Sequence, residues 1–131
     1  MKQNESIIIA RLLDNNLTNR EKGDIYEDYI YNKITDFGMN IRKTKGSGSV
    51  HGNADITTDN ITIDCKFKKR NMDMNNSKSI SVKRNEAEKV RQQASDSSKT
   101  GIIITQLRKN RNKLDNYVII ELEDFLELVS D

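Results

Sequence analysis

The segment Ala54 to Phe67 constrains the fold more than any other part of this sequence, because it reads as two short strands joined by a tight turn. Asp59-Asn60 is a favourable two-residue turn between strands. Such a turn fixes the register of the two strands that it joins. The paired positions are then Thr58 with Ile61, Thr57 with Thr62, Ile56 with Ile63 and Asp55 with Asp64. Side chains alternate along a strand, so we expect an apolar face of Ala54, Ile56, Ile61, Ile63, Cys65 and Phe67 and a polar face of Asp55, Thr57, Thr62, Asp64 and Lys66.

The polar face of this hairpin carries the chemistry. In the predicted register the carboxylates of Asp55 and Asp64 stand opposite each other, with Cβ atoms roughly 5 Å apart, which is unfavourable without a cation between them. Mg²⁺ and Mn²⁺ prefer oxygen ligands, and the backbone carbonyl of Cys65 could supply another. Lys66, two residues after Asp64 on the same face, can assist an attacking water or stabilise charge on a phosphate. The alternative is an ordinary polar strand face on which Lys66 simply neutralises the carboxylates.

The residues before the hairpin predict helices and a strand. Glu5 to Leu13 fits a short amphipathic helix, although its isoleucine run also fits a strand. A capping box at Thr18 to Glu21 and a stop at Gly38 define a second helix. Its apolar stripe is Tyr26, Ile30, Ile34 and Phe37. Met39 to Thr44 is a strand candidate, and Gly46 to Ser49 is the loop between it and the hairpin.

The residues after the hairpin alternate between apolar runs and polar segments. A helix from Ser81 or Asn85 to about Ser98 has a thin apolar stripe, so we expect it to lie on a sheet with its charged side outward. The runs 101–104 and 117–120 are typical of buried strands. A last helix over 121–129 is expected to close the core, and 71–78 and 108–116 read as mobile polar loops.

Composition favours one domain over 1–131, with residues 1–18 the least certain part. Cys65 is the only cysteine, which excludes internal disulfides and favours a reducing, cytoplasmic setting. No apolar run approaches the roughly 20 residues of a membrane span, so neither a membrane partner nor an export signal is expected. Residues 41–113 carry 17 lysines and arginines against 7 acidic residues, whereas the flanks carry 5 against 13. This asymmetry favours a polyanionic partner such as nucleic acid.

Asp55 followed by Asp64-Cys65-Lys66 resembles the signature of the PD-(D/E)XK nucleases. Within that superfamily the chain looks most like the archaeal-type Holliday junction resolvases and their phage relatives. The matching pieces, which span roughly residues 20 to 105, are Lys22-Gly23 with Glu27, Phe37-Gly38 with Arg42, Ser47-Gly48-Ser49, and Gly52 before Asp55. Two departures are Asp64, where the family usually has Glu, and Ala54, where the superfamily name has Pro.

The resemblance implies a restriction-endonuclease-like α/β core, a central mixed sheet flanked by helices, and a homodimer that cuts four-way DNA junctions with Mg²⁺ or Mn²⁺. Glu27, Asp55 and Asp64 would bind or orient metal and water, Lys66 would assist attack, and Ser47 would lie near the scissile phosphate, although Ser49 could take that role. No organic cofactor is implied.

Several basic or polar side chains flank this predicted site and are candidates to contact branched or duplex DNA. They are Arg42, Lys43, Lys45, Ser49, His51, Lys68, Lys69 and Arg70. The aromatic content of 5% argues against recognition of single strands by stacking. A nuclease of different specificity, or a DNA-binding module without activity, remains open on the same sequence.

Overall fold

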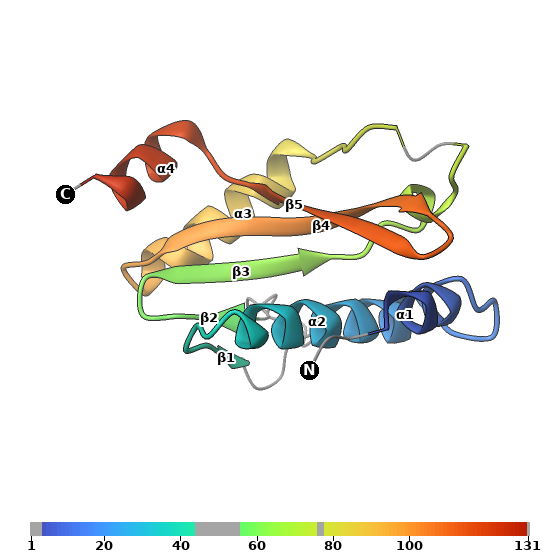
Figure 1. Ribbon diagram of the computed structural model, residues 1–131. Coiled ribbons are helices and arrows are strands. Elements are labelled where there is room, and N and C mark those ends of the chain that lie inside the picture. Colours follow the sequence, from blue (N-terminus) through green and yellow to red (C-terminus); the bar gives the residue numbers. More distant parts are fainter. Residues whose placement is uncertain (1–3, 44–55, 76–77, 131) are drawn as a thin grey trace.

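The computed structural model describes residues 4–43, 56–75 and 78–130. These residues form a five-stranded mixed sheet flanked by helices (Figure 1). The elements are α1 (Glu5–Leu12), α2 (Asn19–Asp36), β1 (Arg42–Lys43), β2 (Ile56–Thr57), β3 (Ile61–Lys66), the 3-10 turn η1 (Lys69–Met72), α3 (Arg84–Asp96), β4 (Thr100–Asn110), β5 (Lys113–Ile119) and α4 (Leu122–Val129). The α/β class and the flanked mixed sheet predicted from the sequence are therefore confirmed. No described helix is long and apolar enough to cross a membrane.

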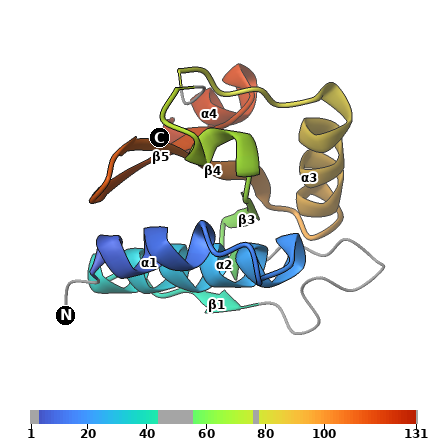
Figure 2. The ribbon, with the colours of Figure 1, turned by 90° about the vertical axis from the view of Figure 1, so that its right-hand side faces the viewer.

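The sheet has the order β1-β2-β3-β4-β5, and its register agrees with the hairpin prediction wherever both strands are described. Ile56 pairs with Ile63 and Thr57 with Thr62. β1 and β2 are antiparallel, as are β2 and β3, whereas β3 and β4 are parallel and β4 and β5 are antiparallel. β1, β2 and β3 thus form an antiparallel meander, and the connection from β3 to its parallel neighbour β4 passes through α3 (Figure 2).

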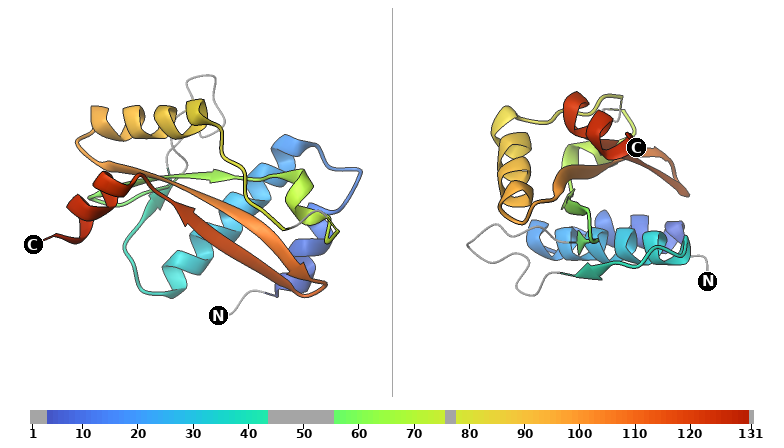
Figure 3. Two further views of the ribbon diagram at one scale, coloured as in Figure 1. Left: turned by 90° about the horizontal axis from the view of Figure 1, so that it is seen from above. Right: turned by 90° about the vertical axis from the view of Figure 1, so that its left-hand side faces the viewer.

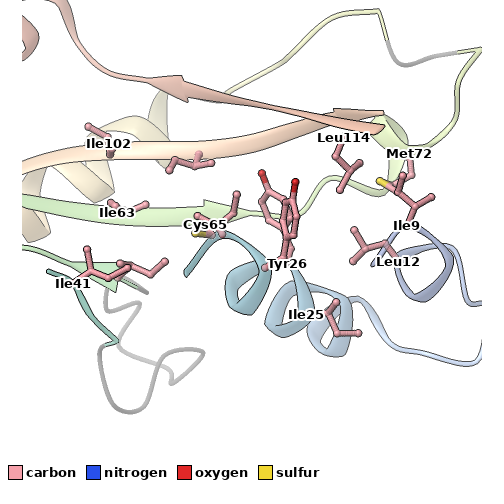
Figure 4. Packing of buried hydrophobic residues seen from close by; sticks show 14 residues of the cluster. Ile9, Leu12, Ile25, Tyr26, Ile41, Ile63, Cys65, Met72, Ile102 and Leu114 are labelled. Carbon is pink, nitrogen blue, oxygen red and sulfur yellow. The ribbon is translucent and has the colours of Figure 1, made fainter. Parts of the chain in front are cut away.

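Two helices cover one face of the sheet, and α3 lies on the other (Figures 2 and 3). α1 and α2 supply apolar side chains that pack against the strands, as the close-up in Figure 4 shows. That core contains Ile9, Leu12, Ile25, Tyr26, Tyr29, Ile30, Ile41, Ile56, Ile63, Cys65, Met72, Ile102, Ile104 and Leu114. On the opposite face Val90 and Ala94 of α3 are buried beside Ile103, so this helix lies on the sheet as its thin apolar stripe predicted.

The beginning and end of α2 follow the sequence signals, but one residue of the predicted stripe is misplaced. Thr18 accepts a hydrogen bond from the backbone of Glu21 while the Glu21 carboxylate accepts one from Thr18, which is the predicted capping box. Gly38 has a φ of +90° immediately after the helix, the conformation that favours glycine at a C-terminal stop. Phe37, however, is 86% exposed, because the helix has ended before it and the chain turns away from the core.

Three expectations for the C-terminal half are wrong. Residues 108–116, expected to be a mobile loop, form the outer ends of β4 and β5 and the tight turn between them. β5 is an edge strand, so Tyr117 and Val118 are exposed rather than buried. α4 does not close the core: none of its residues is buried, and ion pairs from Arg91 to Asp124 and Glu121 tie its first turn to α3.

The segment after β3 also departs from the expected loop at its beginning. Asn71 and Met72 lie in η1 and are 5% and 2% exposed, and the amide of Asn71 donates to the carbonyl of Gln106. The α1 alternatives are settled as well. Asn4 caps a helix, and Glu5 joins it to the rest of the fold by accepting hydrogen bonds from Leu114 and Tyr29.

Replacing Glu5 with Gln should reduce stability at neutral pH by about 1 kcal/mol, because a charged acceptor is lost. Partial burial tends to raise the pKa of Glu5, but the two hydrogen bonds and the nearby Lys113 and Lys33 outweigh it, so the pKa lies below its usual 4.5. A lowered carboxyl pKa contributes stability that is present above the unfolded-state value and lost as pH falls through the folded-state value. Urea unfolding of both proteins from pH 7 to 3 should therefore show their difference narrowing below about pH 4.5. A constant difference would contradict this account.

Candidate active site

β3 carries an ion pair at its C-terminal end. The Lys66 Nζ lies 3.1 Å from a carboxylate oxygen of Asp64, and their side chains are 34% and 18% exposed. Both side chains are on the face of β3 opposite Cys65, which is buried in the core. Thr62, on the same face as the ion pair, is only 5% exposed, because α3 packs against this end of the sheet. The face that the sequence presented as uniformly polar is thus covered at Thr62 and partly open at Asp64 and Lys66.

Backbone alternation shows where the carbonyl of Cys65 points. The N–H of Thr58 donates to Ile61 O, and the N–H of Thr100 donates to Asn60 O. Successive residues of a strand direct their backbone groups to opposite neighbours. The backbone N–H and C=O groups of odd-numbered residues of β3 are therefore directed to β2, and those of even-numbered residues are directed to β4. The carbonyl of Cys65 is directed to the β2 side of the strand, which is the side where the sequence analysis placed the partner carboxylate.

Buried polar side chains fix the chain as it leaves β3. The hydroxyl of Thr105 donates to the carbonyl of Lys66 at 2.8 Å, and the amide of Gln106 donates to the carbonyl of Lys68 at 2.8 Å. Thr105 and Gln106 are both fully buried, so these bonds are shielded from competing water. Since a buried hydrogen-bonded network resists movement, the backbone that presents Lys66 and Lys68 is held in place by β4.

Glu86, at the beginning of α3, is an acidic residue near Lys66 and Lys68 that the sequence analysis missed. Its carboxylate accepts two hydrogen bonds from the Lys68 ammonium, at 2.9 and 3.0 Å. Partial burial tends to raise the pKa of Glu86, but the hydrogen bond from Lys68, the backbone of Lys83 and the charge of Lys66 lower it overall. The one sequence signal that could have drawn attention to Glu86 is its position three residues after Lys83, near the start of a helix. That pattern predicts a helix cap, whereas the contact with Lys68 depends on how α3 crosses the sheet.

Glu27 lies inside the protein rather than on the solvent side of α2. It is 6% exposed, and Lys43 Nζ of β1 lies 4.0 Å from its carboxylate. Lys43 also forms an ion pair with Asp28 and lies over the ring of Tyr31, 5.4 Å from the ring centre. A carboxylate this deeply buried requires a charged or hydrogen-bonding partner. Glu27 is therefore buried on α2 beside Lys43 of β1.

The other predicted DNA-contacting residues divide into three groups. Arg42 is half-exposed and forms an ion pair with Asp59 at 3.5 Å, and Lys68 is held by Glu86. Lys69 and Arg70 of η1 are exposed. The remaining predicted site residues, Asp55, Lys45, Ser47, Ser49 and His51, lie outside the described residues.

The donor set is of the right kind for a hard divalent cation, although the described part of it is incomplete. Asp64 offers carboxylate oxygen and Cys65 a carbonyl oxygen on the β2 side, and oxygen is the ligand that Mg²⁺ and Mn²⁺ prefer. Within residues 4–43, 56–75 and 78–130, no three acidic, histidine or cysteine side chains lie together as a metal centre would require. Any such centre would have to draw on further ligands.

The fold and these residues define a class: a mixed-sheet α/β protein with an Asp-X-Lys ion pair on a central strand and a buried glutamate on α2. Comparison with known protein families, curated proteins and solved structures finds no match.

Proposed function

We propose that this chain is a metal-dependent DNA endonuclease with a restriction-endonuclease-like core, and that its substrates are four-way junctions. The observation that carries the proposal is the register of β2 and β3, with Ile56 opposite Ile63 and Thr57 opposite Thr62. If the same register continued by one further step, Asp55 would stand opposite Asp64. The Asp64–Lys66 pair on the same face then supplies the remaining charges of the PD-(D/E)XK pattern.

The backbone pattern adds a geometric reason for two close carboxylates at this point. Because odd-numbered residues of β3 direct their hydrogen bonds to β2, Thr57–Thr62 is a non-hydrogen-bonded pair. Asp55 and Asp64 would be the next such pair if the register continued, and side chains are closest in pairs of that type, where Cα atoms are about 4.5 Å apart. Two carboxylates and the carbonyl of Cys65 would then converge on one point.

Each residue of this proposed site has a distinct task. Asp55, Asp64 and the Cys65 carbonyl would hold Mg²⁺, and the metal would supply activation of a water and compensation of phosphate charge. Lys66 orients the attacking water and stabilises the negative charge that develops on the phosphate oxygens. Glu27, buried on α2 with Lys43 Nζ of β1 4.0 Å from its carboxylate, would help to orient metal or water, as the resemblance implies. Ser47 contacts the scissile phosphate, with Ser49 as its alternate.

We further propose that the basic surface around β3 binds the backbones of duplex DNA arms. Lys69 and Arg70 are exposed, so their side chains can contact phosphates from solvent. Lys43 and Lys68 are in ion pairs with acidic neighbours, so DNA phosphates would have to compete with those carboxylates. Lys45 and His51 complete the basic set.

Paired cuts across a four-way junction require two active sites, and the apolar face of α4 is the surface that we assign to a homodimer. Leu122, Leu126 and Val129 are 65%, 52% and 59% exposed and, at helical spacing, share one face of α4. Exposed apolar side chains gathered on one face mark an interaction surface. In a two-fold dimer the same patch serves both subunits.

Leu126→Glu should convert this dimer to a monomer, because it places a charge in the apolar interface. Light scattering coupled to size exclusion measures the mass directly. Ile7→Glu is the matched control, since Ile7 is an exposed apolar residue of α1 and should leave the dimer intact. A variant at Leu126 that stays dimeric would exclude α4 as the interface.

A panel of labelled substrates tests the function itself. Four-way junction, duplex and flap DNA are incubated with the protein and Mg²⁺, with an EDTA arm that removes the metal. We expect paired nicks in the junction only, and none with EDTA. Cleavage of duplex or flap instead would indicate a nuclease of different specificity. Binding with no cleavage of any substrate would leave a DNA-binding module in which the Asp64–Lys66 pair is merely structural.

A further inference from the structure

Lys22, in the first turns of α2, is a buried lysine with an unusual environment. The residue is 3% exposed, yet no carboxylate forms an ion pair with its ammonium in the part of the chain that the structure describes. Lysine is almost never fully buried unless it is paired. Because Lys22 lines a pocket and no described carboxylate is paired with it, its ammonium can receive an anion from outside the chain.

Lys22 lines a pocket of about 430 Å³ between the α1–α2 connection and η1. This is the end of the molecule at the right of Figure 1, which faces the viewer in Figure 2. The wall also contains Lys69, Arg108 and Asp73, with Leu12 and Met72 as its apolar part. A pocket of this volume can hold a phosphate group together with its attached sugar.

The charges around the pocket favour an anion. Three cationic side chains, Lys22, Lys69 and Arg108, face a single acidic one, Asp73. The guanidinium of Arg108 is positioned by hydrogen bonds to the carbonyls of Met72 and Asn110, at 3.3 and 3.1 Å. Lysine and arginine together provide the donors and charge that a phosphate oxygen needs.

We propose that this pocket binds a backbone phosphate of nucleic acid at a point separate from the Asp64–Lys66 cluster. The inference takes the identity of the polyanion from the proposed function. Lys69 is five residues after Asp64, so the Cα atoms of these two residues are at most about 18 Å apart. Duplex DNA carries one phosphate per about 3.4 Å of each strand, and the pocket would therefore hold a strand a few nucleotides from the cleaved bond. It fixes register and orientation rather than sequence.

The test is binding without metal, so that it is readable whether or not the protein cleaves DNA. Labelled four-way junction and duplex are titrated in EDTA by fluorescence anisotropy at several salt concentrations. Lys22→Met should weaken binding of both about 5- to 10-fold and reduce the slope of log K against log salt by roughly 0.9. Lys22→Arg should retain affinity. Lys69→Ala, at an exposed position, should weaken binding in the same direction.

Lys33→Met is the matched control, because Lys33 lies on the same helix about 16 Å further along and is 44% exposed. It should change affinity less than 2-fold. Unchanged affinity and salt slope in Lys22→Met and Lys69→Ala, with wild type binding DNA normally, would overturn this site and leave the proposed nuclease intact.

A wild-type protein that binds no DNA would instead remove the proposed function, and inorganic phosphate then decides the pocket. Amide shifts confined to Lys22, Lys69 and their neighbours, followed by NMR during a phosphate titration, would support an anion site for a free phosphate compound. If these amides do not shift, the proposed anion site in the pocket is refuted as well.

Discussion

Lys66→Met is expected to lower the rate of junction cleavage roughly 10²- to 10³-fold while leaving junction affinity within about 3-fold of wild type. The reason is position. The ammonium lies 3.1 Å from Asp64 on a strand whose end is fixed by Thr105 and Gln106, so under the proposed function it would reach the phosphate without rearrangement of the backbone. Single-turnover cleavage with protein in excess measures the chemical step, and anisotropy in EDTA measures binding separately.

Lys68→Met is the matched control for that experiment, since it makes the same substitution two residues further along. Lys68 is held by Glu86, so its loss should alter affinity or stability modestly and change the single-turnover rate less than about 5-fold. If Lys66→Met cleaved as fast as wild type, the assignment of the active site would be wrong whatever the substrate. A large effect in both variants would indicate a general loss of charge or structure rather than a specific role for Lys66.

The hairpin was predictable because its determinants are local. A two-residue turn fixes the register, and alternation then assigns every side chain to a face. The capping box of α2 and the stop at Gly38 were predictable for the same reason, because they also depend only on neighbouring residues. Where the signal is short-range and stereochemical, this sequence was sufficient.

The outer half of the β4–β5 hairpin was missed for the converse reason. Residues 108–113 are almost entirely polar, so they carry no apolar alternation, and the strands are stabilised there by backbone pairing and by contacts from elsewhere. α4 shows a related difficulty. Its apolar stripe is clear in the sequence, but a stripe does not identify the surface that covers it. Among the described residues none of the side chains of α4 is buried.

The depth of charged residues could not be predicted from helical spacing. Lys22 and Glu27 are adjacent to the apolar stripe of α2, where a residue is buried or exposed according to which neighbour packs beside it. Glu27 is covered on the side that carries β1, and Lys22 on the side that carries η1. Glu86 likewise reaches Lys68 only through the crossing of α3 over the sheet. These parts of the candidate site come from tertiary packing.

Gly101→Ala should destabilise the protein by about 3 kcal/mol or more, which makes it the largest stability effect that we expect from a single methyl group. A Cβ at Gly101 would lie 2.5 Å from the carbonyl oxygen and 2.8 Å from the carbonyl carbon of Val90. These are backbone atoms of α3, so no side chain can rotate to make room. Only a shift of the helix from the sheet relieves the overlap, and chemical denaturation measures its cost.

Gly23→Ala provides the control, because it is the same substitution without the overlap. A Cβ at Gly23 would meet nothing within 4 Å, and alanine should stabilise α2 by about 0.5 to 1 kcal/mol. A loss below about 1 kcal/mol at Gly101 would mean that α3 shifts readily, so the Glu86–Lys68 contact would not fix the site. Gly23→Ala with improved stability but weaker junction binding would mean instead that glycine is retained for close approach of DNA beside Lys22.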